Sequence, residues 1–144
     1  MESEEDDPDK RKDLLKRVEE DNVRFVEMQF SDILGTVKSV SIPVTKLKKA
    51  LDEGVFIDGS SILGYTTVEE SDMRAMPIID SYQVYPWTLH GEMRTARLMC
   101  TISDPTVEDE KGNRFPGDPR RALEKVMKKA KEKGLILLSC GMYG

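Results

Sequence analysis

The spacing of apolar residues is helical near the start of the chain and becomes strand-like directly after it. Leu14, Leu15 and Val18 follow the i, i+1, i+4 pattern of a short helix, which we place at residues 9–22. Segments 23–30 and 36–42 are rich in β-branched and aromatic residues and predict two strands. Because a short loop ending in a glycine separates them, these strands predict a β-hairpin.

A short helix and a long loop are predicted next. Pro43 ends the second strand, and Thr45 is placed to cap a helix over residues 46–52 that Gly54 closes. Residues 56–65 show neither helical nor strand periodicity, so we interpret them as a loop. A loop of this length in a small domain is more often functional than idle.

Three further extended segments are predicted at 73–79, 82–85 and 96–102. Pro77 restricts the first of them to an edge or irregular strand. The third alternates well, and its alternation places Cys100 on the inward face in the middle of a strand. We therefore expect a buried, unreactive thiol rather than a nucleophile.

The last regular element is a helix over residues 118–133. Asp118 at the N-cap and Pro119 at the first helical position form a strong helix start, and Gly134 closes the helix. Its apolar face consists of Ala122, Leu123, Val126, Met127 and Ala130. We expect its basic face to be solvated, and residues 135–138 to begin one more strand.

The element order predicts an α+β fold. A mixed or antiparallel sheet with a helix packed across it, preceded by an N-terminal helix, accommodates this order. The sequence contains no internal repeat, no glycine-rich phosphate loop and no dinucleotide-binding fingerprint.

Composition narrows the class of protein. A chain of 144 residues is one ordinary domain, and its net charge of −5 argues against nucleic acid as the main partner. The acidic start, residues 1–9, is expected to be a disordered tail and is the opposite of a signal peptide. Two cysteines, Cys100 and Cys140, form no disulfide framework, and His90 has no second histidine with which to share a metal. We expect a cytoplasmic protein that crosses no membrane.

Candidate chemistry is concentrated in the predicted loop. Asp58, Ser60 and Ser61 are close enough in sequence to direct several oxygens at one small cationic or polar ligand. Gly59 and Gly64 allow backbone turns that other residues resist. The alternative is that these residues only cap turns in a surface loop.

Six motifs along the chain resemble prokaryotic type I glutamine synthetases. The first covers the predicted hairpin, the second is Phe-Ile-Asp-Gly-Ser-Ser, and the others keep the family's order and similar spacings. They lie at positions 24–38, 56–61, 70–73, 85–87, 96–98 and 117–120. Six motifs in register over roughly residues 10–134 form a highly specific match, although each alone is weak.

The resemblance implies a β-grasp domain at residues 10–116 and a connecting helix at 117–134 that begins a catalytic domain. In such enzymes the β-grasp domain packs on a neighbouring subunit, and its loop completes that subunit's active site. By similarity, Asp58 binds ammonium and removes its proton, Ser61 lines the pocket, and Asp72 lies beside the same site.

The resemblance also implies where the remaining chemistry lies. The family is an ATP-dependent glutamate–ammonia ligase, whose ATP site and Mg²⁺ or Mn²⁺ ligands belong to the catalytic domain. Residues 135–144 lack the Glu-x-Glu carboxylates expected after the helix. We therefore expect a truncated chain with no cofactor or metal site of its own, inactive alone, whose partners are copies of itself or full-length synthetase subunits.

Two other hypotheses stay open at this point. The chain could be a stand-alone, inactive interaction module that modulates the assembly of a full-length synthetase, or it could be a non-functional gene fragment. Residues 65–68 stand where many relatives carry a basic residue linked to feedback control, so the sequence does not predict that regulation.

Overall fold

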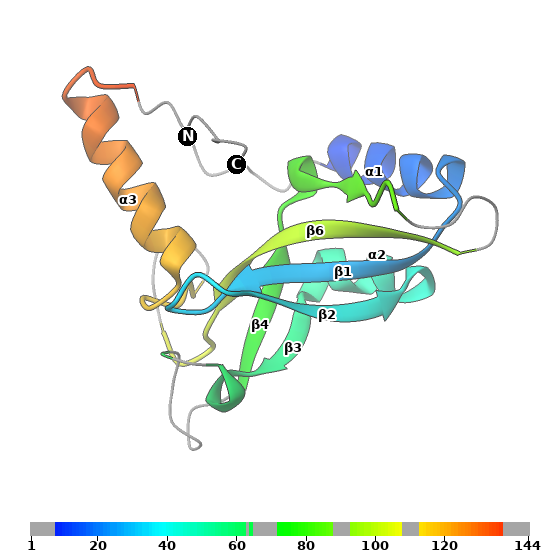
Figure 1. Cartoon of the computed structure of the whole chain (residues 1–144), viewed down its shortest axis with the longest axis horizontal. Coiled ribbons are helices and arrows are strands. Elements are labelled where there is room, and N and C mark those ends of the chain that lie inside the picture. The colour runs from blue at the N-terminus through cyan, green and yellow to red at the C-terminus, as the bar shows by residue number, and fades with distance from the viewer. Residues whose placement is uncertain (1–7, 63, 65–71, 88–92, 108–112, 137–144) are drawn as a thin grey trace.

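A mixed β-sheet forms the centre of the molecule (Figure 1). The computed structural model describes residues 8–62, 64, 72–87, 93–107 and 113–136. The helices and strands are α1 (Pro8–Glu20), β1 (Val23–Ser31), β2 (Val37–Pro43), α2 (Leu47–Glu53), β3 (Val55–Asp58), β4 (Asp72–Pro77), β5 (Gln83–Val84), β6 (Arg94–Ser103) and α3 (Pro119–Glu132). Short 3-10 helices occupy Val44–Lys46, Gly59–Ser61 and Ile79–Ser81.

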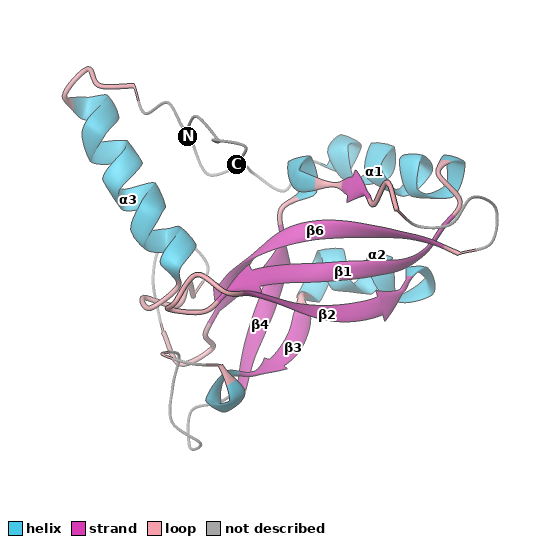
Figure 2. Ribbon diagram, viewed as in Figure 1, coloured by secondary structure: helices cyan, strands magenta, loops and turns pink. Residues whose placement is uncertain are grey.

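The strand order is β2-β1-β6-β4-β3, and β5 pairs with part of β6. β1 runs parallel to β6, and every other pairing is antiparallel. Figure 2 shows the strands as one twisted layer with α1 and α2 alongside it. The predicted α+β fold with a mixed sheet is confirmed.

One face of the sheet carries the core. In β6 the residues Ala96, Leu98, Cys100 and Ile102 are all at most 1% exposed, as the predicted alternation requires. Helix α1 contributes Leu14 and Val18 to the same core, and α2 contributes Leu47, Ala50 and Leu51. Burial raises the pKa of the Cys100 thiol to about 12, which confirms the expected inert cysteine.

The β1–β2 hairpin forms as predicted, with its turn held by a buried acid. The Oδ1 atom of Asp32 accepts hydrogen bonds from the backbone amides of Leu34 at 3.0 Å and Thr36 at 2.9 Å. Gly35 adopts a φ of +80°, a conformation that residues with a Cβ atom resist.

The structure corrects three predictions in the middle of the chain. Strand β4, predicted to be an edge or irregular strand because of Pro77, lies between β6 and β3 and pairs with both, and Pro77 is its last residue.

Residues 56–65 are not loop throughout, because β3 extends to Asp58 and a 3-10 helix follows it. Strand β3 has only four residues, too short for its alternation to stand out in the sequence. The predicted cap by Thr45 is also wrong, since Lys46 occupies the N-cap of α2 without any side-chain hydrogen bond. Gly54 does close α2, with a φ of +72°.

Helix α3 differs most from expectation. Asp118 caps it and Pro119 begins it, as predicted, but none of its residues is buried. The helix extends away from the sheet (Figure 1). Residues 135 and 136 form no strand, and residues 137–138 lie outside the described part of the chain.

Candidate functional site

The Asp58 side chain organises the turn that follows β3. Its Oδ1 atom accepts hydrogen bonds from the backbone amide of Ser60 at 3.0 Å and from the Ser60 hydroxyl at 2.6 Å. Its Oδ2 atom accepts a hydrogen bond from the Ser61 hydroxyl at 3.2 Å. These residues therefore do cap the turn, as the alternative reading of the sequence suggested. The same hydrogen bonds fix the direction in which the Asp58 carboxylate points.

Strand pairing brings the third predicted site residue to the same place. Asp72, the first residue of β4, stands directly opposite Asp58 in the antiparallel β3–β4 ladder. Opposite residues in such a ladder project to the same face, with Cβ atoms about 5 Å apart. Both side chains are exposed, so two carboxylates face solvent together at one end of the sheet.

This pair of acids lies on an open surface. Among the described residues, no three His, Cys, Asp or Glu side chains gather closely enough to hold a metal ion. The described helices include none long and apolar enough to cross a membrane.

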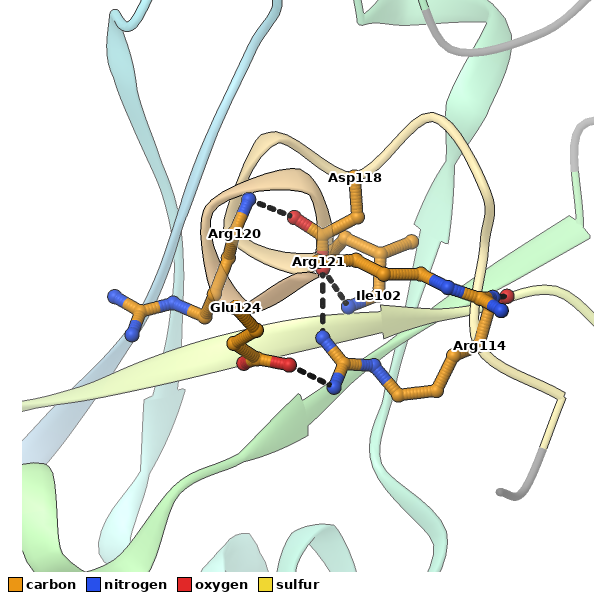
Figure 3. Close-up of polar contacts among 6 residues, drawn as sticks. All are labelled: Ile102, Arg114, Asp118, Arg120, Arg121 and Glu124. Carbon is orange, nitrogen blue, oxygen red and sulfur yellow. Dashed lines mark hydrogen bonds and ion pairs between the residues drawn. The ribbon is translucent and has the colours of Figure 1, made fainter. Parts of the chain in front are cut away.

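A second polar centre, which the sequence did not indicate, joins α3 to the sheet (Figure 3). The carboxylate of Asp118 is 3% exposed. Its Oδ1 atom accepts a hydrogen bond from the Arg120 amide at 2.9 Å, and its Oδ2 atom accepts one from the Ile102 amide of β6 at 3.1 Å.

Arg114 links the same carboxylate to the helix. It contacts the Oδ2 atom of Asp118 at 3.5 Å and donates a hydrogen bond to Glu124 of α3 at 2.7 Å. Arg121 donates in turn to the Arg114 carbonyl oxygen.

A third group lies on the sheet face opposite the core. The Tyr85 hydroxyl donates to the Glu27 carboxylate at 2.7 Å and accepts from the Gln29 amide at 2.6 Å. Burial and this bond to Glu27 raise the pKa of Tyr85 to about 12. The exposed Trp87 ring stacks on Tyr85 with ring centroids 4.6 Å apart. These side chains hydrogen-bond to or stack on one another, and we assign them no catalytic or binding role.

Comparison with known proteins decides the family. A model of the glutamine synthetase β-grasp domain matches residues 22–105, which is more than half of the chain. The chain belongs to the glutamine synthetase family. The match spans β1 to β6 and includes the Asp58 turn and Asp72.

Full-length relatives agree with this assignment. Glutamine synthetase of Staphylococcus aureus strain Mu50 is 42% identical over 131 residues, which is 91% of this chain and 28% of the relative. The Staphylococcus epidermidis enzyme is 41% identical over 129 residues, again 28% of its length. The chain thus spans little more than a quarter of the synthetases that it matches.

Solved structures share the fold. A structure titled apo GmaS without ligand superposes with a TM-score of 0.71 at 22% identity, covering 83% of this chain and 26% of that one. The Plasmodium falciparum glutamine synthetase gives a TM-score of 0.69 at 21% identity, covering 85% of this chain and 23% of that one. Identities this low bear on the fold alone.

These results confirm the predicted family and its β-grasp fold. They do not favour the interaction module or the gene fragment. The roles of Asp58, Ser61 and Asp72 stay predictions, although the structure does bring the three residues together. His90, Cys140 and residues 65–68 lie outside the described part of the chain.

Proposed function

We propose that this glutamine synthetase β-grasp domain supplies half of an ammonium site to a neighbouring subunit, in ATP-dependent glutamine formation. The observation that supports this most strongly is the Asp58–Asp72 pair. Two same-face carboxylates stand opposite each other at an exposed end of the sheet, with the Ser61 hydroxyl bonded to one of them.

The chemistry of the pair suits a small cation. Like charges directly opposite in a ladder repel, so a cation beside them is favoured. Ammonium offers four N–H donors, and hydrogen bonds between charged groups are about twice as strong as neutral ones.

A carboxylate oxygen of Asp58 takes one proton from ammonium, and the electron pair of that N–H bond stays on nitrogen as the lone pair of ammonia. This lone pair attacks the carbonyl carbon of the acyl phosphate made from glutamate and ATP. The C–N bond forms as the C–O bond to the phosphate breaks, and the phosphate leaves with a second N–H proton.

The open position of the acids explains why a second subunit is needed. A carboxylate in water is a weak base, and removing it from water makes it a stronger one. A neighbouring subunit that covers the turn would supply this desolvation. ATP and the divalent metal are assigned to parts of the synthetase that this chain does not represent, and the partner is a synthetase subunit in the cytoplasm.

A chimeric enzyme tests the proposal. The β-grasp region of the Staphylococcus aureus synthetase is replaced by residues 8–136 of this chain, and phosphate release is measured with ATP, glutamate and ammonium. We expect Asp58→Asn to lower kcat/KM for ammonium roughly hundredfold, the usual scale of a lost general base. The KM for ATP should stay unchanged.

The matched control is Asp80→Asn, which removes another exposed carboxylate, one that pairs with Lys10. It should leave the ammonium kinetics of the chimera unaltered, and the unfused chain should release no phosphate. The decisive comparison is the parent chimera against its Asp58→Asn variant. Equal kcat/KM values for ammonium in these two enzymes would refute the role of Asp58.

A further inference from the structure

Ser60 donates two hydrogen bonds to the same oxygen of Asp58. Its hydroxyl lies 2.6 Å from the Oδ1 atom, and its backbone amide lies 3.0 Å from that atom. A hydroxyl–carboxylate distance of about 2.5–2.7 Å is typical of a charge-assisted hydrogen bond. The Ser61 hydroxyl reaches the Oδ2 atom at 3.2 Å. Ser60 thus makes the closer contact with the carboxylate, yet the family resemblance assigns a role to Ser61 and none to Ser60.

Asp58 needs a restraint because its neighbour is another acid. Asp72 stands opposite it in the β3–β4 ladder, and both side chains are exposed. Like charges directly opposite each other in a ladder repel. An exposed aspartate can rotate about χ1 into other staggered rotamers, so the repulsion favours rotamers in which the two carboxylates point apart. The bonds from Ser60 to the Oδ1 atom oppose this rotation.

The backbone that carries Ser60 is itself held in place. Ser60 lies in the 3-10 helix Gly59–Ser61, and the Ile62 amide donates to the Gly59 carbonyl oxygen at 3.1 Å. Ile57 before this turn is 4% exposed, and Ile62 after it is 8% exposed. Both isoleucines belong to the hydrophobic core. Because the core holds both ends of the turn, the two donors of Ser60 are preorganised for the carboxylate.

We propose that Ser60 is a positioning residue for proton transfer, whose hydroxyl holds the Asp58 carboxylate beside Asp72 and within reach of ammonium. This proposal rests on the proposed function. A general base must lie within hydrogen-bond reach of the proton that it accepts, and a misplacement of about 1 Å can lower the rate roughly hundredfold. Ser60 acts through Asp58 and does not itself contact ammonium. Losing its hydroxyl therefore lowers kcat more than it raises the KM for ammonium, because Asp72 and Ser61 are retained.

Nuclear magnetic resonance of the complete chain tests the positioning directly. Scalar couplings to the β carbon and its protons report the χ1 rotamer of Asp58. The parent chain should show one rotamer. Ser60→Ala keeps the amide bond but loses the hydroxyl bond, so its couplings should be averaged over several rotamers, and Ser60→Thr should restore the single rotamer. The matched control is Ser41→Ala, which removes an exposed hydroxyl from β2 and should leave the Asp58 couplings unchanged.

The chimeric enzyme separates this proposal from the proposed function. Ser60→Ala should lower kcat roughly tenfold, with a change in the KM for ammonium of less than about twofold, and Ser60→Thr should restore kcat. A single Asp58 rotamer in Ser60→Ala, or averaged couplings in the parent chain, overturns the positioning role. So does a kcat for Ser60→Ala equal to that of the parent when Asp58→Asn is slow, and the proposed function then stands. Equal kcat/KM values for the parent and Asp58→Asn overturn both.

Discussion

Asp118 connects three parts of the molecule through one carboxylate. One oxygen caps α3, and the other accepts the Ile102 amide of β6 and contacts Arg114. A buried carboxylate is tolerated only where hydrogen bonds and a neighbouring cation replace its water. The position of α3 relative to the sheet therefore depends on this residue.

Replacing Asp118 with alanine should destabilise the fold. The change removes the helix cap and leaves the buried Ile102 amide without its acceptor, which together cost about 3 kcal/mol. Urea unfolding followed by circular dichroism measures the loss. Asp118→Asn keeps an acceptor oxygen for the cap and should cost less. A free energy of unfolding for Asp118→Ala within about 0.5 kcal/mol of the parent, the range of neutral surface changes, would contradict this account.

The candidate site shows which contacts between residues can be read from sequence. The Asp58 turn is local, since its partners lie two and three residues away, and its chemistry was considered from spacing alone. The pairing of Asp58 with Asp72 depends on the β3–β4 register across a long connection. Nothing in the local pattern fixes that register, and Asp72 was identified only through the family resemblance.

At the level of elements, α3 and β3 were the least predictable. The apolar spacing in α3 correctly predicted a helix, but periodicity does not say what covers the apolar face. Leu123, Val126 and Met127 are 51%, 60% and 42% exposed. Longer strands were predicted correctly, because nine residues in β1 give its β-branched and aromatic content, and ten in β6 give its alternation, room to show.

Apolar positions on α3 should therefore contribute little to stability in this chain. Val126→Ala is expected to change the free energy of unfolding by no more than about 0.5 kcal/mol. Leu98→Ala, at a core position that is 0% exposed, should cost about 2–5 kcal/mol. Chemical denaturation of both variants measures the difference. A large loss for Val126→Ala would mean that the α3 face is covered in solution.

Stability of the whole molecule should fall at alkaline pH. Burial raises the pKa of Cys100 from 9.0 to about 12 and that of Tyr85 from 10.0 to about 12. Burial and the bond to Asp21 also raise the pKa of Tyr82. The unfolded chain loses these protons first, so the folded state binds more protons above about pH 9. Stability is fully present below that pH and decreases as the pH rises toward about 12.

Urea midpoints measured between about pH 8 and about pH 11 should show this decrease. Tyr85→Phe removes one of the groups, so its midpoint should fall less steeply above about pH 10 than that of the parent chain. The comparison uses slopes, because the variant also loses the hydrogen bond to Glu27 at every pH. A midpoint that rises with pH, or identical slopes, would contradict the assignment.

The Asp118 attachment also has a mechanical consequence. Helix α3 is held at its first turn and has 14 residues, so it forms a rigid arm about 21 Å long. A rotation of roughly 10° at the base would displace the far end by about 4 Å over that length. A small shift of β6 at the base of α3 thus becomes a larger displacement at the far end of the helix. Any molecule in contact with the apolar face of α3 would be displaced with it.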